Sequence, residues 1–156
     1  MSTTQTSGPI ANRLQRIKDG QDPQMIAQLR SGYVILGKYQ PDPIVGACML
    51  IPDPVVPALN DIDHDTRAAF LTDFALVGDA ILNVTKCERI NYLILCNQVP
   101  ELHAHAIPRF ASEDPEKRLQ GPFEAYDFGS SRVADAEGQD RELFEALRDE
   151  ITRLTA

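Results

Sequence analysis

The spacing of hydrophobic residues predicts one long helix in the middle of the chain. Apolar side chains recur at every third or fourth position: Phe70, Phe74, Val77 and Ile81. This spacing places them on one face of a helix, where they can pack against a core. Asp63 stands just before the pattern, and aspartate is a favoured N-cap. We therefore predict that a long amphipathic helix begins after Asp63.

Three further segments have helical patterns. A short helix near the N-terminus is predicted by three apolar residues: Ile10, Leu14 and Ile17. Residues 22–32 combine aspartate, proline and a final glycine in the order that starts and ends a helix. Residues 140–155 predict a C-terminal helix with one apolar face: Leu143, Leu147, Ile151 and Leu154. The polar residues 1–8 are expected to be disordered.

Short apolar runs between turn residues predict four strands: residues 33–37, 46–51, 90–97 and 101–108. Only a few residues join the last two, too few for a parallel crossover. The order of elements therefore predicts an α+β fold, with an antiparallel sheet and one long helix packed on one face. The length of 156 residues suits a single domain spanning residues 1–156.

The last predicted strand alternates in character. Glu101, His103 and His105 share one side, and the small or apolar residues between them face the helix layer. A polar side that simply meets water is the ordinary interpretation of such a strand. However, two of the three histidines of the whole chain lie in this short stretch, which favours a functional site.

Two kinds of chemistry fit this row of side chains. A neutral imidazole can attack phosphorus while a second, protonated imidazole donates to the leaving group. Alternatively, two imidazoles and a carboxylate are common ligands of zinc or ferrous iron. The spacing alone does not separate these alternatives.

Charge and cysteine content limit the partners. The chain has 15 basic and 23 acidic residues, a net charge of -8, so we expect no nucleic-acid partner, although a small anion could bind. No apolar run is expected to span a membrane. The three cysteines, Cys48, Cys87 and Cys96, form no CxxC pair. We therefore expect free thiols in a cytoplasmic protein.

The segment "HAHAIPR" resembles the signature of the histidine-triad (HIT) superfamily, in which histidines alternate with apolar residues before Pro-Arg. Upstream, "VGACMLIPDPVV", the long predicted helix and "INYLILCN" are similar to family segments in the same order. The resemblance covers about residues 33–110. It looks closest to bacterial members described as diadenosine-tetraphosphate-hydrolase-like.

The resemblance implies roles for particular residues. His103 matches the nucleophile, which takes up a nucleoside monophosphate covalently. His105 matches the residue that contacts the phosphate and the bridging atom, and we expect it to act as the acid. Asn97, Gln98 and Arg109 are the candidate substrate-binding residues, with a surface salt bridge as the alternative for Arg109. The resemblance also implies a small-molecule nucleotide partner, no cofactor or metal, and a homodimer.

Two departures from the family pattern concern the site. Glu101 replaces the first histidine of the triad, and we expect it to orient or tune the other two. In the family the backbone carbonyl at this position orients the nucleophile, and a carbonyl survives any substitution. The glycine-rich loop before the triad is shortened to residues 98–100, so its backbone donors to phosphate are expected to be missing.

Three hypotheses follow. The first is a HIT-like nucleotide hydrolase or nucleotidyl transferase acting on a nucleoside phosphoanhydride or phosphoramidate, for example a dinucleoside polyphosphate. The second is a binding protein of the same fold that retains a nucleotide or another anion without turnover. The third is a metal site formed by Glu101, His103 and His105.

Three aromatic residues within 121–128 are expected to cover an edge of the core, with nucleobase contact as the alternative.

Overall fold

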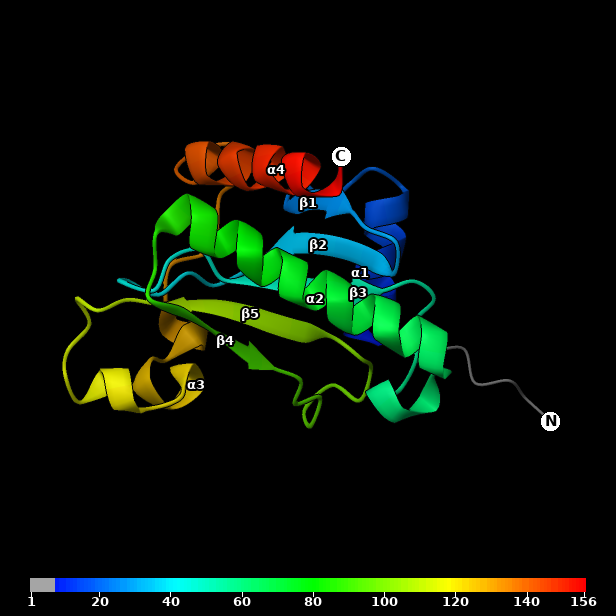
Figure 1. Cartoon of the computed structure of the whole chain (residues 1–156), viewed down its shortest axis with the longest axis horizontal. Helices are drawn as coiled ribbons and strands as arrows, with labels where there is room; N and C mark the ends of the chain where they lie inside the picture. The colour runs from blue at the N-terminus through cyan, green and yellow to red at the C-terminus, as the bar shows by residue number, and fades with distance from the viewer. Residues whose placement is uncertain (1–7) are drawn as a thin grey trace.

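The computed structural model describes residues 8–156 and contains a five-stranded antiparallel sheet with helices on both faces (Figure 1). The strands are β1 (Met25–Gln28), β2 (Gly32–Leu36), β3 (Cys48–Pro52), β4 (Arg89–Leu93) and β5 (Ala104–Arg109). Their order across the sheet is β1-β2-β3-β5-β4. The predicted α+β fold is confirmed. The expected disorder of residues 1–8 lies, apart from Gly8, outside the described residues.

Within residues 8–156, four α-helices surround the sheet: α1 (Pro9–Lys18), α2 (His64–Thr85), α3 (Pro122–Ala125) and α4 (Arg141–Thr155). Figure 1 shows α2 and α4 side by side over one face, with α1 behind the sheet. Alternating residues of β3 account for both layers. Leu50 packs in the core under α2, whereas Met49 and Ile51 pack against α1. Each face of the sheet therefore has its own apolar layer.

The long helix forms where its pattern predicts. The Asp63 carboxylate accepts a hydrogen bond of 2.8 Å from the Thr66 amide and caps α2. The predicted apolar stripe is buried: Phe70, Phe74, Val77 and Ile81. By length and composition alone, α2 would also suffice to cross a membrane, contrary to our expectation of no such run. In this fold the apolar face of α2 covers the sheet instead.

Residues 22–32 form a strand and a turn, so the helix predicted there is wrong. β1 pairs with β2, with Met25 opposite Ile35. The Asp22 carboxylate accepts a hydrogen bond from the Gln24 amide and forms an ion pair with Arg13. Asp22 thus begins a turn and not a helix. Gly32 belongs to β2, where the Ile51 carbonyl approaches so closely that a Cβ atom would clash. Tertiary strand pairing thus overrides the local capping signals.

The two strands that carry the candidate site are shifted from their predicted positions. The strand predicted over residues 90–97 corresponds to β4, which ends at Leu93 and lies at the edge of the sheet. Tyr92 on this edge is 47% exposed. β5 begins at Ala104, so residues 101–103 precede it in an irregular connection.

The C-terminal part combines one regular helix with short turns. α4 packs on α2, and its apolar face is buried as predicted at Leu147 and Ile151. Between β5 and α4, the chain forms α3 and two single-turn 3-10 helices, Lys117–Leu119 and Phe128–Ser130. This segment packs against Ile107, on the face of the sheet opposite α2.

Candidate active site

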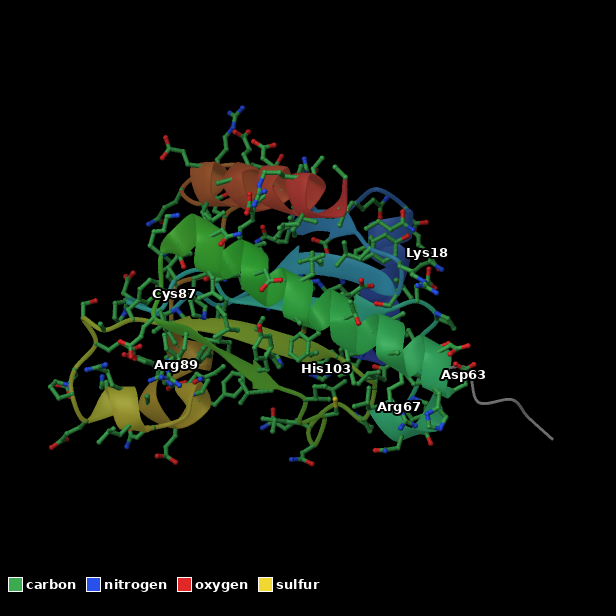
Figure 2. All side chains as sticks on the ribbon, viewed as in Figure 1. Lys18, Asp63, Arg67, Cys87, Arg89 and His103 are labelled. Carbon is green, nitrogen blue, oxygen red and sulfur yellow. The ribbon has the colours of Figure 1, made fainter. Side chains whose placement is uncertain are left out.

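The alternation around β5 separates a core side from a polar side. Leu102, Ala104 and Ala106 are fully buried in the core that α2 covers, as predicted. His105 projects from the opposite face of the sheet, and its ring centroid lies 5.2 Å from that of His103. Figure 2 places His103 near the beginning of β5. The fold thus brings the two histidines together on one face.

A backbone carbonyl fixes the ring of His103. The Nδ1 atom lies 2.7 Å from the carbonyl oxygen of Glu101. Because a carbonyl can only accept a hydrogen bond, Nδ1 carries the proton of the neutral ring. The lone pair then belongs to Nε2, which is the arrangement required for a nucleophile. This is the contact that the resemblance implies for this backbone position.

Cys96 is a neighbour of this imidazole that sequence reasoning missed. Its Sγ lies 3.7 Å from Nδ1 of His103 and 3.5 Å from the carbonyl oxygen of the same residue. The backbone of Cys96 has a φ of 55°, in the left-handed region. Sequence analysis predicts only a free thiol here, because the turn that brings Cys96 back to His103 leaves no local signature in the sequence.

The Glu101 carboxylate does not join the two histidines. Glu101 is 4% exposed, and its carboxylate accepts hydrogen bonds from the backbone amides of Ile10 at 3.0 Å and Ala11 at 3.2 Å. These amides are the first of α1, where the helix dipole favours a negative charge. The expectation that this side chain tunes the histidines is therefore wrong, because the carboxylate caps α1. Only the backbone carbonyl of Glu101 orients His103.

Burial keeps His105 uncharged. Loss of solvent lowers its pKa to about 4, and the neighbouring His103 contributes in the same direction. Phe123 covers the other side of His105, with ring centroids 5.3 Å apart and planes at 82°. A neutral imidazole can donate a hydrogen bond through N–H, but it holds no excess proton. In the free protein, His105 is therefore not the protonated acid that we expected from the sequence.

A cavity of about 530 Å³ lies against the two histidines. Its walls come from three segments: His103 and His105, residues 95–99, and Phe123 with residues 126–129. The predicted substrate-binding residues Asn97 and Gln98 line it and are exposed. This volume suits a small-molecule ligand.

The shortened loop before β5 retains amide donors. Between residues 8 and 156, the amides of Asn97, Gln98 and Val99 find no hydrogen-bond acceptor. Because these residues line the cavity, their amides are available to a ligand or to water. The shortened loop thus keeps amides without an acceptor beside the cavity, and the expected loss of donors to phosphate stays a prediction.

Arg109 serves the structure and not the cavity. The residue is 6% exposed, and its guanidinium pairs with Glu113 at 2.9 Å. The remaining donors bind Asn91 Oδ1 and the carbonyl oxygens of Lys117 and Gln120. Because every N–H donor of Arg109 is occupied, the prediction that it contacts the substrate phosphate is wrong. The alternative prediction of a surface salt bridge is also wrong, because the ion pair with Glu113 is buried. Figure 2 shows Arg89, the strand partner of Arg109, toward the other end of these strands from His103.

The hypothesis of a metal site at Glu101, His103 and His105 is also wrong. The carboxylate is held at the start of α1, and its two amide contacts aim it away from an ion shared with the imidazoles. In the part of the chain from residue 8 onward, no group of three or more potential ligands is placed to hold a metal ion.

Comparisons with known proteins relate this geometry to solved structures. No family model and no curated protein matches the chain. A histidine triad protein from Bradyrhizobium japonicum is 25% identical with a TM-score of 0.68, covering 81% of this chain and 89% of that one. One from Sinorhizobium meliloti is 23% identical with a TM-score of 0.69, covering 93% and 98%.

A hypothetical histidine triad nucleotide-binding protein from Sulfolobus tokodaii is 19% identical with a TM-score of 0.70, covering 92% and 93% of the two chains. The matches to the Sinorhizobium and Sulfolobus proteins cover more than nine-tenths of both chains in each pair. Both matches therefore extend well beyond the resembling residues 33–110. The chain therefore has the fold of the histidine triad proteins.

Proposed function

We propose that the protein is a nucleotide hydrolase or nucleotidyl transferase that uses His103 as its nucleophile on a nucleoside phosphoanhydride or phosphoramidate. The observation that carries this proposal is the 2.7 Å contact between Nδ1 of His103 and the Glu101 carbonyl. It leaves the lone pair on Nε2, beside a cavity large enough for a nucleotide. The likeness to histidine triad structures supports the same reaction class.

The reaction would proceed in two displacements at phosphorus. In the first, Nε2 of His103 bonds to phosphorus while the bond to the bridging oxygen or nitrogen breaks and its electron pair leaves with that atom. The nucleotidyl group is now attached to the imidazole. In the second, water or another acceptor attacks phosphorus and the Nε2–P bond breaks. Nucleoside monophosphate is released, a proton goes to solvent, and the neutral imidazole returns.

The uncharged state of His105 favours one leaving group over another. A phosphoanhydride expels a weakly basic phosphate oxygen, which needs little protonation. A phosphoramidate expels an amine, which must gain a proton as the bond breaks. Because burial lowers the pKa of His105 to about 4, this residue supplies a hydrogen bond more readily than a proton. We therefore place phosphoanhydrides, such as the dinucleoside polyphosphates, first among the candidate substrates.

The uncharged state of His105 also supports a second candidate function. Without a charged acid at the leaving group, the cavity could hold a nucleotide or another anion through the loop amides without turnover. This binding protein would share the fold and the ligand of the enzyme. The two functions differ in whether a covalent bond to His103 ever forms.

The test is a screen of purified protein against dinucleoside polyphosphates and nucleoside phosphoramidates, followed by acid-free trapping of phosphorylated imidazole. His103→Ala should abolish turnover and the trapped adduct. His64→Ala is a matched control, because His64 lies exposed at the first position of α2. Turnover that survives in His103→Ala would refute the nucleophile. Tight binding with neither turnover nor adduct would establish the binding function instead.

A further inference from the structure

One part of the cavity is larger and less polar than a phosphate site requires. The phosphate would lie at His103 and the loop amides, which form one side. The remaining space extends along the segment after β5, past Phe123 to Phe128. A phosphate alone would leave this space to water. The shape therefore indicates a ligand with a second, bulkier group.

Aromatic rings form a continuous row along this wall. The row begins at the nucleophile and runs through His105, Phe123 and Phe128, with successive centroids 5.2, 5.3 and 4.8 Å apart. Phe123 is 40% exposed although Tyr126, three residues on, is buried in the core. The segment thus presents an aromatic side chain to the cavity while another anchors it.

The polar groups on the same side disfavour a second anionic group. Asp127 lies between the two phenylalanine positions in the wall and is exposed. Its carboxylate would repel a further phosphate but could accept a hydrogen bond from an amino group. A planar, uncharged group with N–H donors on its edge fits both the rings and this carboxylate.

We infer that Phe123 and Phe128 form the binding surface for the nucleobase of the nucleotidyl group that His103 receives. This inference rests on the proposed function and adds which residues hold the base. A base on this surface would bring its phosphate to His103 and leave the departing polyphosphate to exit past the loop at residues 97–99. Both phenylalanines would then be determinants of specificity for a nucleoside over a base-free phosphate.

Phe123 also covers His105, so the two effects need separate variants. Phe123→Leu keeps an apolar cover on His105 but removes the aromatic face. Phe128→Leu removes the second ring of the wall, which contacts Phe123 and not His105. Leu119→Ala is the matched control, because Leu119 lies in the same segment, is 90% exposed and lines a different cavity.

The experiment measures binding of four nucleoside 5′-monophosphates and of ribose 5-phosphate by isothermal titration calorimetry. These probes carry the same phosphate on the same sugar carbon and differ in the base. A base stacked on aromatic side chains should improve affinity about 5- to 150-fold over ribose 5-phosphate. Phe123→Leu and Phe128→Leu should remove most of that ratio, whereas Leu119→Ala should leave it unchanged. Proton NMR of His105 checks that it remains neutral in Phe123→Leu.

Every outcome bears on the inference. A base-dependent ratio that falls in both phenylalanine variants supports it. No preference for any nucleoside monophosphate over ribose 5-phosphate overturns it, and so does a preference that both variants retain, since the base must then bind elsewhere. The proposed function is decided separately by turnover and adduct formation in His103→Ala, so the two can fail independently.

Discussion

The contact between Glu101 and α1 leads to a prediction about stability. Glu101→Ala removes the acceptor of the Ile10 and Ala11 amides. The bond to Ile10 is buried, so its amide would be left without a partner, whereas water can reach the partly buried amide of Ala11. Gly8 touches the same carboxylate so closely that a Cβ atom there would clash.

The magnitude follows from the two hydrogen bonds. A hydrogen bond to a charged group contributes about 1.5–3 kcal/mol, and a buried amide without a partner costs about 1–3 kcal/mol. Loss of an N-cap contributes about 0.5–2 kcal/mol in other helices. Because only one of the two amides is buried, we expect Glu101→Ala to lower the free energy of unfolding by about 2–4 kcal/mol. For a chain of this size, that corresponds to a Tm lower by roughly 4–16 °C.

Urea and thermal unfolding of four variants test this reasoning. Glu137→Ala is the control, since Glu137 is exposed and should change stability by less than about 0.5 kcal/mol. Gly8→Ala should destabilise by displacing the carboxylate, whereas Gly121→Ala, which has open space around it, should not. If Glu101→Ala unfolds like Glu137→Ala, the carboxylate does not cap α1 and the reasoning fails.

Four further predictions concern charge and assembly. Arg109→Ala should lower the free energy of unfolding by about 3–5 kcal/mol, because it leaves the buried Glu113 without its ion-pair partner. Arg118→Ala, which breaks an exposed ion pair, should lower it by under about 1 kcal/mol. Equal effects of the two substitutions in urea unfolding would contradict the structural role of Arg109. Burial raises the pKa of Glu113, but hydrogen bonds from Arg109 and Tyr126 outweigh it and the net pKa is lowered. The ionised Glu113 carboxylate therefore stabilises the fold above pH 4.5, and this stabilisation is lost as the pH falls through the pKa of Glu113 in the folded protein. Glu113→Gln should make the free energy of unfolding depend less on pH in this acid range. Because the pKa of His105 is lowered from 6.5 to about 4, the unfolded chain binds this proton first, and stability should fall as pH drops from 6.5 toward 4; an NMR titration of His105 with a midpoint near 6.5 would refute this. The exposed edge of β4 supports a homodimer of the 17.3 kDa chain, and a monomer mass by light scattering at micromolar concentration would disprove it.

The sequence determined those features that depend on local periodicity. The stripe from Phe70 to Ile81 specifies a helix whose one face must be buried, and Asp63 specifies where it starts. The alternation from Leu102 to Ala106 separates core positions from polar ones, because successive side chains of extended backbone point to opposite sides. These patterns sufficed for the α+β fold and for the pairing of His103 with His105.

Local signals failed where distant segments compete. Residues 22–32 carry good helix caps, yet hydrogen bonding to β2 makes them a strand, since pairing and burial outweigh capping by a few residues. The position of Arg109 soon after the two histidines predicts a contact with phosphate. In the folded chain, however, its guanidinium donates to Glu113 and to three further acceptors. The cover of Phe123 over His105 likewise joins residues 18 positions apart and depends on how the segment after β5 folds back.

Glu101 shows this division within one residue. Its place in the row of alternating residues follows from the sequence, and its backbone carbonyl orients His103 whatever side chain it carries. The destination of its carboxylate depends on α1, which is 90 residues away in the chain and presents unpaired amides at its first turn. A buried carboxylate must find donors, and only the tertiary structure decides that these are the amides of a helix and not the imidazoles beside it.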